Sequence, residues 1–170
     1  LLFPETHFEM VRPGIATYGM WPSDETFLSF SGERKMKISL VPALSWKTKI
    51  AQIKTVPSGE LIGYGCTYKT TRDSKIAILP IGYYDGYDRG ISNAHVLIHG
   101  KRASIRGRVC MNIIMVDVTD IPEASLEDTV TLLGRDGDEI ISAEQFAKWA
   151  STINYEITTR INDRIPRIYV

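Results

Sequence analysis

Two tyrosines lie beside glycines in a way that could present their phenols for chemistry. Tyr64 stands between Gly63 and Gly65, and Tyr83 follows Gly82 at the end of an apolar run. A phenol can donate or accept a hydrogen bond or transfer a proton, and glycines allow the sharp turns that hold a large ring away from regular packing. The local pattern alone more often describes ordinary β-turns whose tyrosines cover a core. The role of both tyrosines therefore depends on the rest of the chain.

Two further groups could bind ligands, but each has a plainer interpretation. Gly14 follows Arg12 and Pro13 and could expose backbone N–H groups, as phosphate-binding turns do. An ordinary loop explains the same three residues. His95 and His99 are four residues apart and would share one face of a predicted strand. Because no third ligand is nearby, the sequence does not indicate a metal site.

Bulk composition argues against several classes of partner. The chain has 170 residues, with 20 basic and 20 acidic side chains and no dense basic cluster of the kind that binds nucleic acid. The basic stretch at residues 101–108 is interrupted by apolar residues, as on a solvated strand face. No apolar run approaches the ~20 residues of a membrane helix. Two cysteines suit a reducing cytoplasm. Because residue 1 is leucine, we expect a fragment of a longer chain.

The elements that would position these residues are mainly β-strands. Charged residues change face near residues 50–52, which predicts a bulge or sharp bend within a long strand. The uniformly apolar residues 76–81 indicate a strand buried on both faces. The predicted strands and turns are 44–56, a turn at 57–60, 76–81, a hairpin of 95–98 and 102–105 about residues 100–101, 113–118, and 129–133.

One short helix is predicted after residue 142. Ser142 and Gln145 have the spacing of a capping box, and Phe146, Trp149 and Ala150 would form its buried face. Residues 31–37 are polar and predict a connector. About seven strands with frequent turns and one helix favour a β-barrel or sandwich.

Six separated segments resemble the C-terminal half of bacterial alanine racemase. The segments are 11–19 (VRPGIATYG), 63–68 (GYGCTY), 80–86 (PIGYYDG), 107–111 (GRVCM), 153–156 (INYE) and 164–167 (RIPR). Each segment is a weak signal alone. Together they follow the family's order at roughly its spacings and extend over the whole chain.

The resemblance implies a specific fold and domain organisation. These enzymes have an N-terminal (β/α)8 barrel and a C-terminal Greek-key β-barrel domain. Residues 1–25 would be the last barrel strand and its phosphate-binding loop, residues 26–40 a connector, and residues 41–170 the β-barrel domain. This placement agrees with the location of phosphate sites after the last strands of such barrels. No lysine here lies in the family motif that binds pyridoxal 5′-phosphate (PLP) covalently, so the fragment alone is expected to be inactive.

The resemblance also implies an activity and a division of labour between two subunits. The family interconverts L- and D-alanine for cell-wall synthesis in the bacterial cytoplasm, as a homodimer that shares its sites. Tyr64 matches the base that removes the α-proton of L-alanine. Tyr83 and Met111 match residues beside the substrate carboxylate, and all three would reach the partner's site.

Four other residues match groups that hold the cofactor of their own subunit. Arg12 matches the arginine facing the pyridine nitrogen of PLP, to which a guanidinium can only donate a hydrogen bond. Gly14 and Ile15 match backbone N–H groups that bind the phosphate. Tyr155 matches a tyrosine that binds the phosphate and crowds the substrate side chain, which favours alanine.

Three positions complete the comparison with the family. Arg89 and Arg108 match arginines at the substrate entrance, where positive charge attracts carboxylates. Asn112 stands where the family usually has aspartate, and this departure could change gating or the tuning of Tyr64. Two alternatives stay open: a serine or broad-specificity racemase, against which Tyr155 argues, and a non-catalytic β-barrel for oligomerisation or small-molecule binding.

Overall fold

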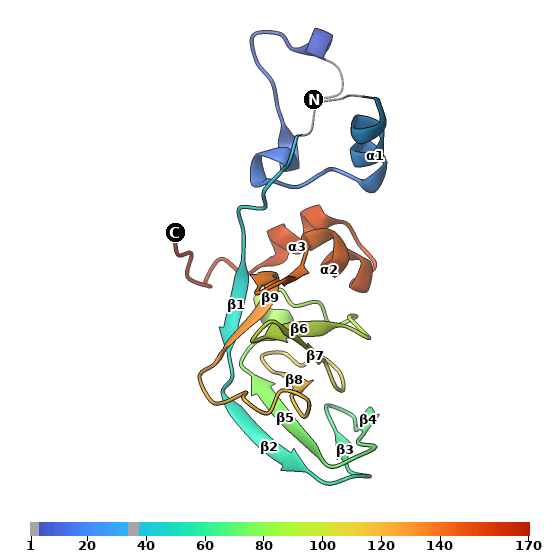
Figure 1. Cartoon of the computed structure of the whole chain (residues 1–170), viewed down its shortest axis with the longest axis vertical. Coiled ribbons are helices and arrows are strands. Elements are labelled where there is room, and N and C mark those ends of the chain that lie inside the picture. The colour runs from blue at the N-terminus through green and yellow to red at the C-terminus, as the bar shows by residue number, and fades with distance from the viewer. Residues whose placement is uncertain (1–3, 34–37) are drawn as a thin grey trace. The chain divides into compact units, whose positions relative to one another are not determined.

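The computed structural model describes residues 4–33 and 38–170 (Figure 1). The chain divides into two compact units, Leu1–Leu44 and Ser45–Val170. All strands of the described residues belong to the second unit. The connector predicted at residues 31–37 lies largely outside the described residues.

The first unit contains two 3-10 turns and one helix. The turns are η1 (Pro4–Thr6) and η2 (Gly14–Tyr18), and the helix is α1 (Asp24–Glu33). Ser23 caps α1, because its Oγ accepts a hydrogen bond from the Thr26 N–H at 3.2 Å. The Trp21 ring packs on Phe30, with ring centroids 5.3 Å apart. The sequence analysis predicted no helix here.

The second unit is built from antiparallel strands in three sheets. One sheet has the order β1-β9-β6-β7 with β10 beside β9, the second has the order β2-β5-β8, and β3 pairs only with β4 among the described strands. The bounds are β1 (Trp46–Lys49), β2 (Gln52–Val56), β3 (Leu61–Ile62), β4 (Tyr68–Lys69), β5 (Ser74–Leu79), β6 (His95–Ile98), β7 (Lys101–Ser104), β8 (Ile114–Asp117), β9 (Thr129–Asp136) and β10 (Glu139–Ile141). The predicted fold class, mainly β, is confirmed. In the described residues the strands do not close into one hydrogen-bonded barrel.

A bend after β1 transfers the chain from the first sheet to the second. Ile50 is fully buried at this point, and the Ala51 N–H already bonds to the Ile78 carbonyl of β5 at 2.9 Å. The predicted bend at residues 50–52 is confirmed, but residues 44–56 form two strands in different sheets. An isolated bridge between Ile105 and Val116 links the same two sheets a second time.

The core of this unit lies between the sheets and helix α2 (Ala143–Trp149). In β5, Ile76, Ala77 and Leu79 are buried while Ile78 is half-buried, so burial on both faces is confirmed for most of this strand. Tyr87 and Phe146 meet edge to face in the core, with ring centroids 4.9 Å apart. This contact anchors the loop after β5 to α2.

The β6–β7 hairpin turns one residue earlier than predicted. His99 and Gly100 form the turn, with φ values of 52° and 71°. Two-residue hairpin loops favour positive φ because it matches the right-handed twist of the strands that they join. The prediction that His95 and His99 share a strand face is therefore wrong. His99 Nε2 instead lies 2.7 Å from Asp128 Oδ2. Within residues 4–33 and 38–170, no three His, Cys, Asp or Glu side chains are grouped to hold a metal.

Two helices follow the last strand. Ser142 caps α2 by accepting a hydrogen bond from the Gln145 N–H at 3.1 Å, which confirms the predicted start. Ala143, Phe146 and Ala147 form its buried face, so this face includes Ala147 and not the predicted Ala150. Helix α3 (Asn154–Arg160) was not predicted. None of the helices described has the length and apolar character needed to cross a membrane.

Candidate active-site face

Tyr64 is held beside the segment that leads to Met111 by two glycines in direct backbone contact. A Cβ added to Gly63 would lie 3.0 Å from the Gly107 Cα, and a Cβ on Gly107 would lie equally close to the Gly63 Cα. Both residues have positive φ, 87° and 74°, which only glycine adopts without strain. The contact places the Tyr64 turn against Gly107 and Arg108.

A second close approach joins Tyr83 to Met111. The Tyr83 N–H donates to the Cys110 carbonyl at 3.0 Å, and the next N–H along the chain donates to the Met111 carbonyl at 2.9 Å. A Cβ on Gly82 would lie 2.2 Å from the Cys110 carbonyl oxygen, so no larger residue fits there. Residues 107–111 therefore connect the two tyrosine turns that the sequence singled out.

The side chains brought together in this way face solvent. The exposed fractions are 67% for Tyr64, 56% for Met111 and 41% for Tyr83. None of the described residues accepts a hydrogen bond from the Met111 N–H. Exposed aromatic and apolar groups in one region are typical of ligand or partner surfaces. We call this region the tyrosine face, defined by Tyr64, Tyr83, Met111 and Arg108.

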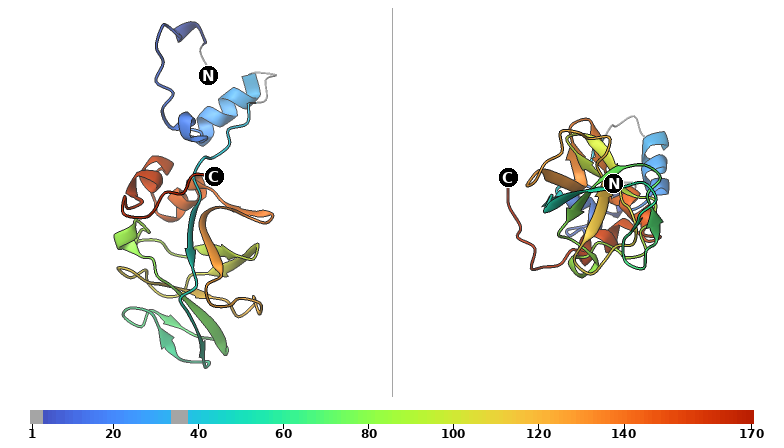
Figure 2. Two further views of the ribbon diagram at one scale, coloured as in Figure 1. Left: turned by 90° about the vertical axis from the view of Figure 1, so that its left-hand side faces the viewer. Right: turned by 90° about the horizontal axis from the view of Figure 1, so that it is seen from below.

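Helix α3 is fastened to the Tyr83 turn, which forms the short 3-10 segment η3 (Tyr83–Asp85). Asn162 follows α3, and its backbone N–H and its Nδ2 donate to the carbonyls of Asp85 and Tyr84, both at 3.0 Å. A Cβ on Gly86 would meet the Arg160 carbonyl oxygen at 2.3 Å. Tyr155, in the first turn of α3, is 40% exposed. Figure 2 (left) shows the β3–β4 hairpin, η3 and α3 along one side of this unit.

The two arginines predicted at a substrate entrance are free to meet anions. Arg89 and Arg108 are exposed, and neither forms an ion pair with any residue in the described part of the chain. Arg102, Arg106 and Arg160, by contrast, each pair with a carboxylate. An unpaired guanidinium on a solvent-facing loop can attract a carboxylate substrate.

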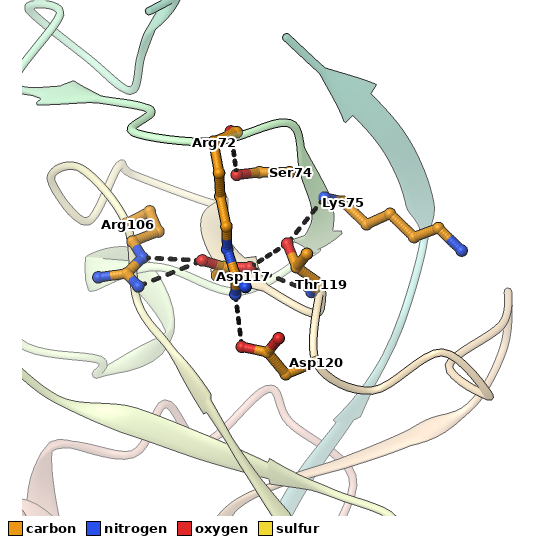
Figure 3. Close-up of polar contacts among 7 residues, drawn as sticks. All are labelled: Arg72, Ser74, Lys75, Arg106, Asp117, Thr119 and Asp120. Atoms are coloured by element: carbon orange, nitrogen blue, oxygen red, sulfur yellow. Dashed lines mark hydrogen bonds and ion pairs between the residues drawn. The ribbon is translucent and has the colours of Figure 1, made fainter. Parts of the chain in front are cut away.

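A polar network is centred on the Asp117 carboxylate (Figure 3). Arg106 Nε and Nη2 lie 3.3 Å and 3.2 Å from Asp117 Oδ2. Thr119 donates its Oγ1–H to Asp117 Oδ1 at 2.6 Å and accepts the Lys75 N–H at 3.0 Å. Burial of Asp117 opposes its ionisation, but hydrogen bonds from Thr119 and Arg106 outweigh burial and lower its pKa. Asp117 is therefore charged, and both of its carboxylate oxygens accept hydrogen bonds, from Arg106 and Thr119.

The predicted cofactor residues of the first unit lie on its η2 turn. Gly14 opens η2 with φ at 61°, and nothing lies within 4 Å of the position of its missing Cβ. Ile15 is buried, whereas Arg12 is exposed and pairs with no carboxylate of the described residues. Within the first unit, the open turn at Gly14 and the unpaired guanidinium of Arg12 suit an anionic ligand.

Sequence reasoning missed three residues that support these elements. Tyr84, in η3, contacts the segment that follows α3, because Arg164 Nη1 donates a hydrogen bond to its hydroxyl at 3.2 Å. Asn162 bonds to the carbonyls of Asp85 and Tyr84, and Arg106 bonds to Asp117. The only sequence signal for Tyr84 was its position next to Tyr83, and none marked Asn162 or Arg106.

Known proteins resemble this chain in sequence over nearly its whole length. Residues 43–169 match the family described as "Alanine racemase, C-terminal domain". The alanine racemase of Leptospira interrogans is 49% identical over 171 residues, which cover 100% of this chain and 44% of that protein. That of Methanococcus maripaludis is 47% identical over 167 residues, covering 98% and 43%.

Solved structures give the same result. The crystal structure of alanine racemase from Bacillus anthracis with bound L-Ala-P matches with a TM-score of 0.83 at 46% identity, over 92% of this chain and 39% of that chain. The enzyme from Streptomyces lavendulae matches with a TM-score of 0.83 at 38% identity, over 98% and 42%. The chain spans less than half the length of the relatives that it matches. With its matching residues, fold and shared motifs, this chain belongs to the alanine racemase family and carries the family's C-terminal domain.

Proposed function

We propose that residues 1–170 are the C-terminal portion of a PLP-dependent alanine racemase, an isomerase that interconverts L- and D-alanine. Its product would serve cell-wall synthesis in the bacterial cytoplasm. The observation that carries the proposal is that two backbone contacts which only glycine permits join the turns of Tyr64 and Tyr83 to residues 107–111, with the side chains of Tyr64, Tyr83 and Met111 all exposed. The names of the relatives support the same activity.

Tyr64 would act as the base for L-alanine. Racemisation removes the α-proton from one side of the substrate and returns a proton to the other side, so it requires two proton-transferring groups. The exposed phenol of Tyr64 provides one of them, and it would take the α-proton on its oxygen. The second would be a lysine outside residues 1–170.

The rest of the tyrosine face would bind and orient the substrate carboxylate. The Met111 N–H points to no acceptor among the described residues and can donate to a carboxylate oxygen. The Tyr83 side chain comes from the adjoining turn and lines the same region. The free guanidinium groups of Arg89 and Arg108 would raise the local concentration of anionic substrate at the entrance.

Four residues would hold the cofactor. The open, left-handed Gly14 and the following Ile15 N–H suit a phosphate, and the Tyr155 hydroxyl would add a donor. Arg12 would donate a hydrogen bond to the pyridine nitrogen and, because a guanidinium keeps its protons, would leave that nitrogen unprotonated. PLP, when bound, supplies the electron-withdrawing ring that acidifies the α-C–H bond. The bulk of Tyr155 would favour alanine over serine, which relative kcat/KM values for the two substrates test.

The working form would be a homodimer whose subunits share each site. Arg12, Gly14, Ile15 and Tyr155 would serve the chain's own cofactor, while the tyrosine face would enter the partner's site. The exposure of large apolar groups around this face supports a covered surface, because isolated domains rarely expose several such groups together. The neighbouring exposed residues are Leu61, Tyr84 and Ile113.

Replacing Tyr64 by phenylalanine in the native protein that contains residues 1–170 tests the proposal. Loss of a positioned base should lower kcat/KM for alanine racemisation by about 100-fold or more. Tyr169→Phe, a change of the same type at an exposed position near the chain end, should leave it unchanged. Equal rates for Tyr64→Phe and the unsubstituted protein would mean that this β-domain is a non-catalytic module. Residues 1–170 alone, given PLP and L-alanine, should not racemise.

A further inference from the structure

The hairpin that carries Tyr64 has little secondary structure of its own to hold it in place. Strands β3 and β4 pair at only two positions, Leu61 with Lys69 and Ile62 with Tyr68. No other strand of the described residues adds to this sheet. An isolated two-stranded hairpin is marginally stable in water. A hydrogen bond from the Cys66 N–H to the Gly63 carbonyl closes the Tyr64 turn, and Thr70 bonds to Gly59 and Glu60 at the open end of the hairpin. These bonds lie within the hairpin, so the orientation of Tyr64 relative to the rest of the unit depends on contacts between the two.

Arg106 makes a side-chain contact that joins this hairpin to the second sheet. Its guanidinium carbon lies 4.8 Å from the centroid of the Tyr68 ring, within the range of a cation–π interaction. The same guanidinium donates two N–H groups to Asp117 at the end of β8. The backbone N–H of Arg106 donates to the Met115 carbonyl at 2.8 Å. One planar side chain thus bridges β4 and β8. Figure 3 shows the Asp117 side of this bridge.

The bridge is better defined than an ordinary surface ion pair. The side chains of Arg106 and Asp117 are 32% and 9% exposed, compared with 59% and 33% for Arg102 and Glu139. Asp117 also accepts the Thr119 N–H at 3.1 Å, so its carboxylate cannot swing away without losing several bonds. Partly buried, multiply bonded pairs keep their geometry in salt, whereas exposed pairs contribute little.

We propose that Arg106 is a positioning residue that sets where the Tyr64 phenol stands. The residue after Arg106 is Gly107, which contacts Gly63 immediately before Tyr64. The Arg106 side chain itself stacks on Tyr68, four residues after Tyr64. Arg106 thus fixes the Tyr64 turn from both ends. The inference rests on the proposed racemase function, because only then does the position of the phenol affect a reaction.

Loss of this bridge should displace the phenol and slow proton transfer without removing the base. In the native protein that contains residues 1–170, Arg106→Gln should lower kcat/KM for alanine about tenfold, since small misplacements of reacting groups have large effects on rate. Arg102→Gln is the matched control, because it removes an ion pair of similar type from β7 that does not touch the hairpin. It should retain the full rate.

A second pair of variants tests the stacking partner. Tyr68→Phe keeps the ring on which Arg106 stacks and should behave like the unsubstituted protein. Tyr68→Leu removes the ring and should match Arg106→Gln. Combining Arg106→Gln with Tyr68→Leu should cost no more than either change alone, because the two side chains act through one contact.

The primary α-deuterium isotope effect on kcat/KM distinguishes positioning from a loss of folded protein. If Arg106→Gln misplaces the base for L-alanine, that proton transfer becomes more rate-limiting. The isotope effect should then rise with α-deuterated L-alanine and fall toward unity with α-deuterated D-alanine. A smaller active fraction would scale both rates and leave both isotope effects unchanged, and that result would overturn the inference.

Hydrogen–deuterium exchange provides a readout that does not depend on activity. Backbone amides of residues 59–70 should exchange faster in Arg106→Gln than in Arg102→Gln or the unsubstituted protein. Unchanged exchange in this segment would refute the bridge even if the rate fell. If the unsubstituted protein does not racemise alanine at all, the proposed function fails, while the exchange result still decides whether Arg106 holds the hairpin.

Discussion

Tyr87 is completely buried, and its hydroxyl forms no hydrogen bond with any described residue. Burial alone raises the pKa of this phenol, so the side chain stays neutral. A buried hydroxyl without a partner costs about 1–3 kcal/mol of desolvation. We therefore expect Tyr87→Phe to raise the free energy of unfolding of residues 1–170 by about 1 kcal/mol, measured by urea denaturation.

The matched control for Tyr87 is Tyr87→Leu, which removes the ring that packs on Phe146. This variant should destabilise the chain by roughly 3 kcal/mol because it leaves space in the core. If Tyr87→Phe is instead destabilising, the hydroxyl has a partner such as an internal water, and the assignment of an unpaired group is wrong.

His95 gives the second unit a built-in sensitivity to acid. Burial lowers its pKa, the charge of Arg102 acts in the same direction, and Glu139 opposes both. The Trp149 ring packs against it at 4.9 Å between centroids. Because the folded state favours neutral His95, its contribution to stability is complete above the unfolded pKa of ~6.5 and is lost as pH falls below that value.

Urea denaturation of residues 1–170 at pH 7 and pH 5 tests this dependence. The loss of stability between the two values should be smaller in His95→Phe than in the unsubstituted chain, because the substituted side chain binds no proton. His7→Phe, the same change of residue type at an exposed position of the first unit, is the control. Identical pH dependence in all three proteins would contradict the burial of a neutral His95.

Individual site residues were predictable where a motif contained them. Tyr64, Tyr83 and Met111 were assigned to one site through their family segments, and backbone contacts bring the turns that carry them together. Arg106 could not be found in this way. Its role depends on Asp117 and Tyr68, which are eleven and thirty-eight positions away in sequence, and no local pattern records such a contact.

The η3 turn depends on a close approach that a single methyl group would block. A Cβ on Gly82 would lie 2.2 Å and 2.4 Å from the carbonyl oxygens of Cys110 and Met111. Because these atoms belong to backbone, they cannot move aside without shifting residues 107–111. We expect Gly82→Ala to destabilise residues 1–170 by about 2–3 kcal/mol in thermal or urea denaturation.

A glycine with open surroundings supplies the control for Gly82. Gly32 lies in α1, and nothing lies within 4 Å of the position of its missing Cβ. Gly32→Ala should be neutral or stabilising by up to about 1 kcal/mol, because alanine favours the helix. Equal effects of the two substitutions would show that the approach of Gly82 to Met111 is looser than described.

Helix α3 and the partners of the strands around Ile50 could not be predicted from sequence, for different physical reasons. Helix α3 contains isoleucine and two threonines, whose branched side chains lower helix propensity, and one of its two buried residues, Asn154, is polar and breaks the apolar pattern that Ile157 would continue. The bend at Ile50 was predictable because charges changed face there. Its transfer of the chain to another sheet was not, since strand partners are set by distant residues.

If the proposed dimer shares its sites, two variants that are each inactive should complement one another. Tyr64→Phe would disable the partner's site, and Arg12→Ala would disable the chain's own. In a mixed dimer of these variants, one site would combine both changes and the other would contain neither. Random mixing should therefore restore roughly a quarter of the unsubstituted activity, as expected for a symmetric dimer with shared sites.

The control for complementation is each variant mixed with itself, which should stay inactive at the same total concentration. Exchange of subunits can be followed by native mass spectrometry with one variant isotopically labelled. If mixed dimers form and no activity returns, then Tyr64 and Arg12 serve the same subunit. The sequence implied this division only through family resemblance, because the two residues lie in separate compact units.

The paired glycines at 63 and 107 also constrain how this family can diverge. Each occupies the space that a side chain on the other would need, and each has a backbone conformation that other residues adopt only with strain. A change at one position cannot be compensated by a change at the other, since both are already the smallest residue. Drift should therefore spare the two positions together. Their joint invariance would be the evolutionary signature of a fixed distance between two loops.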